Sequence, residues 1–442
     1  MQAQIRRRAG RHKRAYILAE RRQAQYGTAM PDATDSQLAA QYEAFPYPRR
    51  DPRDEARRLV VGSPSHLHEI DHWVFGAGRP RSLGLRALIA GGGTGDGTIM
   101  LAQQLARAGR SGRVTYLDRS AAAMAVAQAR AATRGLTNID WQRGSLLELP
   151  GGLGLFDYID CCGVLHHLPD PAEGLAALVR ALAPGGGIGL MVYAPHGRTG
   201  VYPLQDALRL LAPEDEPPAT RLDVARRVMR HLPESAWLRQ NRSFGDHFEG
   251  GDAGLYDLLL NPRDRAFTVT ALHELLAGAG LEVACWVEPL RYEPGAYLPD
   301  ARLRARIGEL DPVARAACAE GLCGNMGTHV VYCVRAGERP ERPDSQAPTA
   351  VPVAREIPAQ EIAAAIQADG MLVLNFDGLR MPLALPAQAR AILGLIDGRR
   401  TVGEIGATLT GRGMAPAAFQ SAWRATFAAL ESVNRLLLAS PR

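Results

Sequence analysis

A run of glycines between an apolar stretch and a helical pattern is the strongest chemical signal in the sequence. Residues 87–98 read ALIAGGGTGDGT, so glycines occupy the alternate positions 91, 93 and 95. Glycine lets the chain turn sharply and lets ligand atoms approach the backbone, and free N–H groups at the start of the following helix attract polar or anionic groups. The dinucleotide fingerprint G-x-G-x-x-G would need glycine where Asp96 stands. The run therefore predicts a ligand-binding loop and disfavours a dehydrogenase.

Polar and small residues follow the next three apolar runs, at the edge where open parallel sheets bind ligands. Asp118 ends the second run, and a carboxylate there can accept hydrogen bonds from two neighbouring ribose hydroxyls. Ser145 and Leu146 follow the third run, at a natural position for an adenine edge, and Gly163 follows the fourth. These positions predict a nucleoside-containing ligand.

Candidate groups for catalysis and for an acceptor lie nearby in the sequence. His166 and His167 follow the fourth run, and a histidine with a pKa near ~6.5 suits a general base; alternatively, one of them only hydrogen-bonds the backbone of the turn. Tyr42 and Tyr47 lie in a proline-stiffened stretch and are expected to close over the ligand, Tyr42 as a catalytic candidate, or else to pack on the sheet edge. The other substrate-binding candidates follow the fifth run, where ordinary loop surface is the alternative: Tyr193, His196, Arg198 and Tyr202.

Alternating strands and helices are predicted to position these residues. Strands are predicted over 86–90, 114–118, 139–142, 157–162 and 188–193, and helices over 98–108, 121–133 and 172–182. Such alternation indicates an α/β fold with a parallel sheet covered on both faces. Residues 196–265 interrupt the pattern as a helical insertion, after which a helix over 268–280 and strands over 281–287 and 329–334 resume it.

Taken together, these motifs resemble the class I S-adenosylmethionine-dependent methyltransferases, over roughly residues 40–336. The resemblance implies a seven-stranded, mostly parallel Rossmann-like sheet of order 3-2-1-4-5-7-6, with the last strand antiparallel. It implies S-adenosylmethionine as cofactor, bound by Gly91, Gly93, Thr94, Gly95, Asp118, Arg119, Ser145, Leu146 and Gly163. Two positions depart from the family. Ile89 stands where an acid often supports the amino group of the methionine, and Ser145 stands where aspartate is common.

The activity that the resemblance implies is transfer of the sulfonium methyl group to an O or N nucleophile of a small-molecule or peptide acceptor. Because the leaving group is good, most of the catalytic work is alignment, with a base needed only where the acceptor must lose a proton. Two alternatives stay open: a nucleic-acid methyltransferase that uses a basic arm, and a non-catalytic scaffold that binds S-adenosylmethionine.

Charge is unevenly distributed along the 442 residues. The net charge is +5, yet residues 1–30 contain eight basic residues and one acid, so the remaining chain sums to −2. We therefore predict a flexible basic arm over 1–30 and an almost neutral body, whose charge disfavours nucleic acid as a partner. The six cysteines lack zinc-like spacing, His66, His68 and His72 have no carboxylate-rich motif beside them, and no apolar run approaches the ~18 residues of a membrane span. We expect a cytoplasmic protein with no metal.

The C-terminal region predicts a separate small unit. Prolines between 340 and 358 predict a stiff, solvated linker over 337–360, after a methyltransferase domain over 31–336 with its helical cap at about 196–265. Within 361–442, Asp377-Gly378 favours a hairpin, Thr401 and Glu404 have capping-box spacing, and Phe419 to Leu430 follow a helical period. The unit resembles winged-helix peptide-recognition modules, which implies docking of a peptide.

Overall fold

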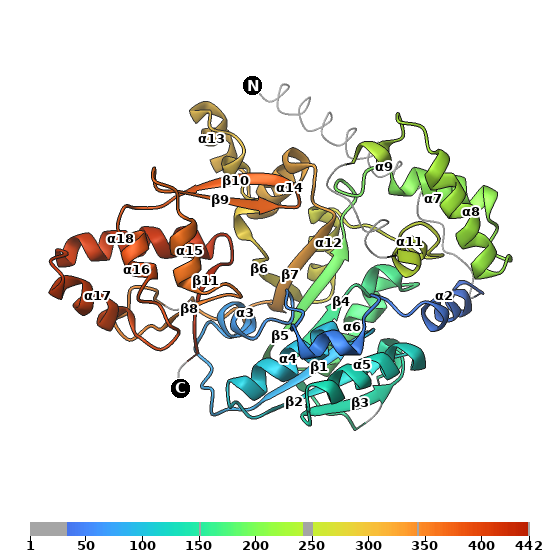
Figure 1. Cartoon of the computed structure of the whole chain (residues 1–442), viewed down its shortest axis with the longest axis horizontal. Helices are drawn as coiled ribbons and strands as arrows, with labels where there is room; N and C mark the ends of the chain where they lie inside the picture. The colour runs from blue at the N-terminus through green and yellow to red at the C-terminus, as the bar shows by residue number, and fades with distance from the viewer. Residues whose placement is uncertain (1–32, 150–151, 242–250, 343, 441–442) are drawn as a thin grey trace, which may run out of the picture.

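The computed structural model describes residues 33–149, 152–241, 251–342 and 344–440 (Figure 1). Its main sheet has the predicted strand order, β3-β2-β1-β4-β5-β7-β6, and β7 runs antiparallel to both β5 and β6. The strands are β1 Leu85–Ala90, β2 Gly112–Asp118, β3 Ile139–Arg143, β4 Phe156–Cys162, β5 Leu182–Tyr193, β6 Leu281–Trp286 and β7 Thr328–Arg335. The seven-stranded, mostly parallel Rossmann-like sheet is thus confirmed. The predicted basic arm over 1–30 lies outside the described residues.

Helices cover both faces of this sheet because side chains alternate between the two faces along each strand. On one face, α4 (Asp96–Arg107) and α5 (Ala121–Thr133) pack with Ile89 and Tyr158, together with the short helices α3 (Leu67–Glu69) and η2 (Ile70–Val74). On the other face, α6 (Pro171–Ala181) and α12 (Val269–Gly278) pack with Leu88 and Ile159. Short 3₁₀ turns η3 (Leu146–Glu148) and η4 (Leu165–His167) follow β3 and β4.

The predicted insertion is helical and has its own apolar core. It contains α7 (Val201–Leu211), α8 (Pro218–His231), α9 (Trp237–Gln240) and α11 (Gly251–Leu259), which bury Leu204, Leu222 and Leu255 among them. The lead-in helix α2 (Ala33–Ala44) ends beside this insertion, where the Phe45 ring stacks on Tyr256 at 5.2 Å between centroids. The lead-in also contains η1 (Pro52–Ala56).

Elements between β6 and β7 were not predicted from the sequence. They are the 3₁₀ turns η5 (Pro289–Tyr292) and η6 (Pro294–Ala296) and the helices α13 (Ala301–Gly308) and α14 (Pro312–Cys323). The arginine-rich helix α13 has few large apolar residues, Leu303 and Ile307, which hides it from a pattern-based prediction. Its start and that of α14 are marked instead by N-cap aspartates, Asp300 and Asp311.

The C-terminal region forms the predicted hairpin and helices. Strands β9 (Met371–Phe376) and β10 (Leu379–Ala384) turn at Asp377 and Gly378, which both have positive φ. Helices α15 (Ala359–Ala365), α16 (Ala389–Leu393), α17 (Val402–Gly411) and α18 (Pro416–Glu431) complete it, and the capping box at Thr401 is present. The likeness to a winged helix stays a prediction.

The segment predicted as a solvated linker is partly built into the fold. Its residues Pro352–Ala354 form β8, which pairs antiparallel with β11 (Leu436–Leu438). Val353 and Leu437 are buried in the same cluster as Ile70 and Trp73, beside the main sheet. A wholly solvated linker is therefore a wrong prediction, because the pairing partner of β8 lies about 80 residues away, beyond the range of any local pattern.

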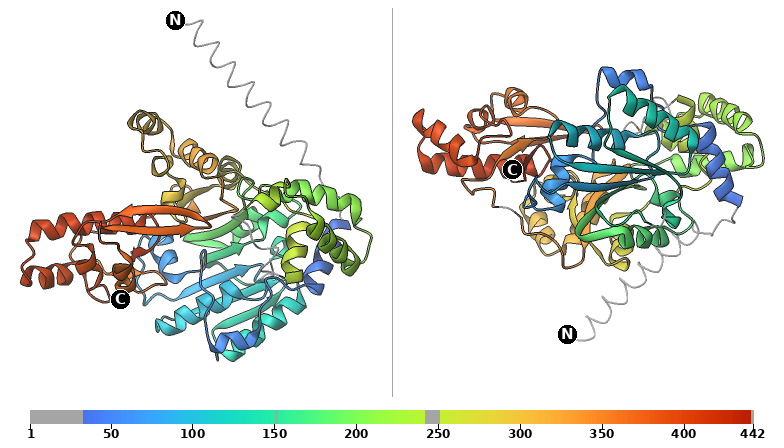
Figure 2. Two further views of the ribbon diagram at one scale, coloured as in Figure 1. Left: turned by 45° about the horizontal axis from the view of Figure 1, so that its top comes forward. Right: turned by 90° about the horizontal axis from the view of Figure 1, so that it is seen from below.

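The C-terminal elements and the helical insertion lie at opposite ends of the molecule, with the sheet between them (Figure 2). Among the described residues, every helix falls short of the length and apolar character that a bilayer-spanning helix needs.

Candidate cofactor and acceptor site

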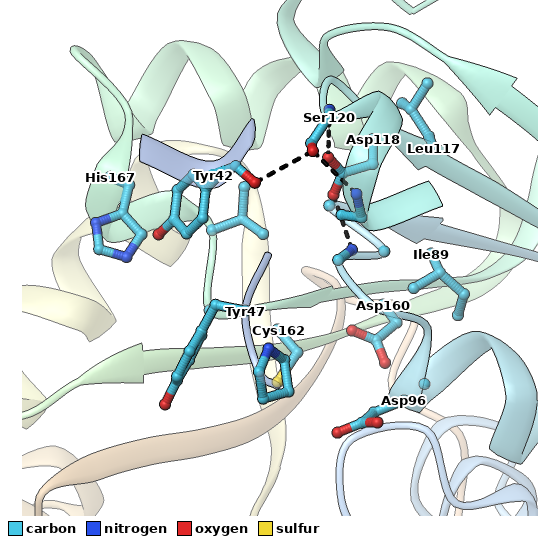
Figure 3. A pocket seen from close by; sticks show the side chains of 18 of the residues that line it. Tyr42, Tyr47, Ile89, Asp96, Leu117, Asp118, Ser120, Asp160, Cys162 and His167 are labelled. Atoms are coloured by element: carbon cyan, nitrogen blue, oxygen red, sulfur yellow. Dashed lines mark hydrogen bonds between the residues drawn. The ribbon is translucent and has the colours of Figure 1, made fainter. Parts of the chain in front are cut away.

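A cavity of about 840 Å³ lies at the carboxyl ends of β1, β2 and β4. Its walls come from the glycine loop, the strand ends, the lead-in residues 38–65 and helix α11 of the insertion. Open α/β sheets bind ligands at this edge, and the volume is in the range of small-molecule sites. Figure 3 shows Asp118, Ile89 and Asp160 at one end of this cavity and Tyr42, Tyr47 and His167 at the other.

The glycine loop forms one wall of the cavity. Gly91 has φ +83°, and a Cβ there would lie 2.2 Å from Cγ2 of Val164. The N–H of Gly93 donates to Oδ2 of Asp118 at 2.8 Å, so that the loop and the end of β2 are held together. The loop is thus a tight backbone turn with no room for a side chain at position 91, and its binding of a ligand stays a prediction.

Two of the predicted cofactor-binding residues support the loop without lining the cavity. Gly95 begins α4 with φ +101°, and a Cβ on it would approach Cβ of Ala127 on α5 to 2.8 Å. Thr94 is buried, and its hydroxyl donates to the carbonyl of Pro48 at 2.7 Å. Gly95 therefore allows α4 and α5 to pack closely, and Thr94 attaches the loop to the lead-in. The predicted direct contact of these two residues with the cofactor is corrected accordingly.

Asp118 lies where a ribose would need it. Its Oδ1 accepts the N–H of Ser120 at 2.8 Å and its Oδ2 accepts that of Gly93. Burial raises the pKa of this carboxyl, and the backbone N–H groups oppose that rise. Each oxygen keeps a lone pair for a ligand hydroxyl. Arg119, Ser145, Leu146 and Gly163 also line the cavity.

Tyr42 and Tyr193 meet at the other end of the cavity on a carboxylate that sequence reasoning missed. The Tyr42 hydroxyl donates to Oδ1 of Asp257 at 2.9 Å, and the Tyr193 hydroxyl donates to Oδ2 at 3.0 Å. Asn261 donates to the same carboxylate at 3.1 Å. Burial, together with the charge of Asp257, raises the pKa of both tyrosines. Both therefore stay protonated, which argues against Tyr42 as a base. No sequence pattern distinguishes Asp257 within the insertion.

The two adjacent histidines are separated by the fold. His167 lines the cavity, and its Nδ1 lies 2.5 Å from the carbonyl oxygen of Arg263, which can only accept a hydrogen bond. Nδ1 therefore carries the proton, and Nε2 is left as an acceptor. His166 is fully buried, stacks on Tyr193 at 3.9 Å and does not line the cavity; burial holds its pKa far below the usual value. Of the two predicted histidines, His167 is the one that lines the cavity, where a general base would have to lie.

Three of the residues predicted to bind the acceptor, His196, Arg198 and Tyr202, lie outside the cavity. The reason is that the chain turns away from the cavity wall after Tyr193. Arg198 pairs with Asp264 at 2.6 Å and holds its guanidinium 3.7 Å above the centre of the Tyr193 ring. Tyr202 joins the same cluster. The half-exposed His196 lies 3.9 Å from Glu320 instead. Arg198 and Tyr202 thus hold Tyr193 in place, whereas Tyr47 does line the cavity.

Two further polar groups of the cavity were missed by the sequence analysis. Asp96, noted there only as a missing glycine, binds Arg50 at 2.6 Å and Arg130 at 2.7 Å. Asp160 on β4 accepts a hydrogen bond from Ser65 and is 2% exposed. Asp160 could have been singled out from the sequence, because it is a carboxylate within the apolar strand β4.

Comparison with known proteins places residues 88–188 within a family model described as a methyltransferase domain. The matched segment contains the glycine loop, Asp118, Gly163 and both histidines. The segment from β1 to the middle of β5 is therefore similar to a methyltransferase domain, and the order of the seven-stranded sheet agrees with that similarity. The cavity offers what S-adenosylmethionine, the cofactor of this class, requires: a glycine cradle and a carboxylate with lone pairs free for ribose.

Two curated relatives match parts of the chain. An uncharacterized protein of Synechococcus sp. is 33% identical over 270 residues, 60% of this chain and 63% of its own length. The ubiquinone biosynthesis O-methyltransferase of Marinobacter nauticus is 32% identical over 155 residues, 34% of this chain and 60% of its own length. The chain thus spans less than two thirds of either relative.

A solved structure shares the fold over most of the chain. PKMT2 from Rickettsia typhi has a TM-score of 0.58 at 14% identity, over 86% of this chain and 78% of that one. It has also been solved in complex with AdoHcy. Residues 1–336 are about three quarters of the present chain, so the shared fold extends into the C-terminal elements.

Proposed function

We propose that this protein transfers a methyl group from S-adenosylmethionine to an O or N nucleophile of a small-molecule acceptor. The observation that carries the proposal is one cavity with two chemically distinct ends. The glycine loop and Asp118 offer a nucleoside site at one end. Nε2 of His167, an acceptor in the tautomer that the Arg263 carbonyl selects, and the Tyr42–Asp257–Tyr193 cluster offer an acceptor site at the other.

The residues of the chain have separable tasks in this proposal. When bound, S-adenosylmethionine supplies an electrophilic methyl group on a sulfonium whose leaving group is a neutral thioether. Asp118 accepts hydrogen bonds from the ribose, and Gly91 and Gly93 admit the cofactor against the backbone. Tyr42, Tyr47 and Tyr193 exclude water and orient the acceptor. His167 takes up at Nε2 the proton that the acceptor's hydroxyl or ammonium group releases, while Arg263 holds its tautomer.

A small acceptor is supported by two independent features. The acceptor end is walled by side chains from three separate segments, Tyr42 and Tyr47 of the lead-in, Tyr193 of β5 and Asp257 of α11. Relatives that match the domain include a ubiquinone biosynthesis O-methyltransferase and demethylmenaquinone methyltransferases. A peptide acceptor, docked on residues 361–442, is the second candidate. The β9–β10 hairpin favours it, because these strands form a sheet of two strands among the described residues and peptides add as strands to sheet edges.

Calorimetry tests the cofactor half of the proposal. We expect S-adenosylmethionine and S-adenosylhomocysteine to bind the intact protein, and Asp118→Ala to weaken both by roughly 10- to 100-fold through the lost ribose hydrogen bonds. Absence of binding by the intact protein would refute both the cofactor and the enzyme.

A transfer assay with a labelled methyl group tests the acceptor half. Fractions of small phenols and amines, of peptides and of nucleic acid are offered separately. Label in the small-molecule fraction supports the proposal, and label only in peptide or nucleic acid overturns it. Binding of cofactor with no label in any fraction indicates a scaffold that binds S-adenosylmethionine.

A further inference from the structure

The position that departs from the methyltransferase pattern, Ile89, leaves the cofactor's amino group without its usual carboxylate. Ile89 lines the cavity near the end of β1 and is 3% exposed. Its side chain has no hydrogen-bonding group, so an ammonium beside it would need another partner. An ammonium that is buried without a partner strongly weakens binding.

The strand beside β1 supplies a carboxylate at the same level. In the parallel register of β1 and β4, Asp160 is the direct partner of Ile89. Paired residues point to the same face of a sheet, and Figure 3 shows both side chains on the same side of the cavity, with Asp160 between Ile89 and Asp96. A carboxylate therefore lies on the strand next to position 89, in register with it.

Asp160 is built to receive a hydrogen-bond donor. It is 2% exposed, and its Oδ2 accepts the Ser65 hydroxyl. Its Oδ1 is buried and has no hydrogen-bond partner within the described ranges. Two tyrosines fix the segment that carries Ser65, since Tyr332 donates to the carbonyl of Pro64 at 2.9 Å and Tyr158 donates to the same oxygen. The carboxylate is therefore rigidly held, with one buried oxygen that lacks a donor within the described residues.

Three other carboxylates that line the cavity already accept hydrogen bonds on both oxygens. Asp96 accepts from Arg50 and Arg130, and Asp118 accepts a backbone N–H on each oxygen. Asp257 accepts from Tyr42 on one oxygen and Tyr193 on the other. Among these four carboxylates, Asp160 is the one with an oxygen that has no donor within the described residues.

We propose that Asp160 binds the ammonium group of the cofactor's methionine end through Oδ1, in place of the acid that position 89 lacks. The inference rests on the proposed cofactor, S-adenosylmethionine. The ammonium is preferred over the sulfonium because the sulfonium has no hydrogen to donate, whereas Oδ1 lacks a donor.

Ligands that differ in a single group test the proposal without altering the protein. Calorimetry compares S-adenosylhomocysteine with its analogue in which the α-amino group is replaced by hydrogen. We expect the wild-type protein to bind the analogue roughly 10- to 100-fold more weakly, the range for a hydrogen bond between charged groups. Equal affinity for the two ligands would overturn the proposal.

Asp160→Asn completes a double-mutant cycle. The variant should bind S-adenosylhomocysteine as weakly as the wild type binds the analogue, and it should no longer distinguish the two ligands. Asp157→Asn is the matched control, because Asp157 is on the same strand but contacts Arg86 and Arg79 outside the cavity. Its affinities should equal those of the wild type.

The outcomes separate this inference from the proposed function. A wild type that binds neither S-adenosylmethionine nor S-adenosylhomocysteine refutes the proposed cofactor itself. If both bind but Asp160→Asn still distinguishes the two ligands, Asp160 does not hold the ammonium. A loss confined to S-adenosylmethionine would assign Asp160 to the sulfonium and overturn the proposal.

Discussion

Burial acts in opposite directions on the acids and bases around the cavity. It raises the pKa of Asp160 to about 6 and raises that of Tyr193, while it lowers the pKa of His166. In each case the neutral form is favoured, because a low-dielectric surrounding disfavours charge. A ligand or a partner that restores the charge therefore changes the protonation of the site, and this can be measured.

His167 is the residue whose removal separates catalysis from binding. His167→Gln should lower kcat by roughly 10²- to 10⁴-fold, the usual contribution of a positioned base, with the affinity for S-adenosylhomocysteine unchanged. Methyl-transfer rates and calorimetry on the same preparations measure both quantities. His196→Gln is the control, since that side chain is half-exposed outside the cavity. Retention of the wild-type rate by His167→Gln would show that the acceptor needs no base there.

Asp160 predicts a pH dependence of cofactor binding. Its pKa near 6 means that it is protonated below pH 6, and a neutral carboxyl pairs poorly with an ammonium. Affinity for S-adenosylhomocysteine should therefore be about tenfold weaker at pH 5 than at pH 7. Nearby Tyr158 and Cys162 do not interfere, because burial raises their pKa further, and the pKa of Asp96 is lowered.

Asp160→Asn should remove this component of the pH profile while keeping any component from Asp118. The same variant should melt higher than the wild type in the absence of cofactor at pH 7.5. The reason is that the ionised carboxylate destabilises the folded state above about pH 6, and this penalty disappears as the pH falls towards ~4, the unfolded value. A variant that keeps the full pH profile would contradict the assignment.

At the scale of elements, the lead-in residues 45–66, between α2 and α3, are attached to the helices that cover the sheet. We call this segment the strap. Arg50 joins it to α4 through Asp96, and Glu55 joins it to α5 by accepting from Arg130 at 2.6 Å. The hydroxyl of Thr94 donates to the carbonyl of Pro48. Residues of this strap line the cavity, so its attachment and cofactor affinity should be coupled.

Arg50→Gln tests that coupling. Loss of a bidentate, partly exposed pair is worth on the order of 1 kcal/mol, so affinity for S-adenosylhomocysteine should fall about 3- to 10-fold. Arg53→Gln is the matched control, because Arg53 is in the same segment, fully exposed and paired only with Asp51 among the described residues. Equal affinities of the two variants would show that the strap does not depend on the Arg50–Asp96 pair.

At the scale of the whole molecule, a buried carboxylate connects the C-terminal region to the strap. Glu69 is fully buried, accepts from Tyr332 at 2.6 Å and from Ser63 at 2.5 Å, and also binds Arg355 and Asn434 of the C-terminal region. Ser63 lies two residues before Ser65, the partner of Asp160. The C-terminal region is thus connected, through Glu69 and Ser63, to the segment that holds Asp160.

Arg355→Met should destabilise the protein as a unit. It leaves Glu69 buried without its cation, which costs about 3–5 kcal/mol. Calorimetry should show one lowered transition, since the C-terminal strands share a core with the sheet. Arg399→Met, on an exposed turn, is the control. If only a small C-terminal transition shifts, that region folds independently of the sheet.

The sequence by itself determined the sheet and predicted the nucleoside half of the proposed site. Strand and helix periods, the glycine loop and Asp118 are local in the chain, and the strand ends of a parallel sheet always meet at one edge. The Asp377-Gly378 turn and the capping box at Thr401 were predictable for the same reason.

Only the tertiary structure decided the acceptor end and the partner of each buried charge. Tyr42 and Tyr193 bind Asp257 from 215 and 64 residues away along the chain. Strand β8 likewise pairs with β11, which lies about 80 residues further along. His166 and His167 are neighbours in sequence but differ in burial and hydrogen bonding. The cause is physical: a residue's period reports which face of its own element is apolar, whereas the packing of distant elements decides which charges meet.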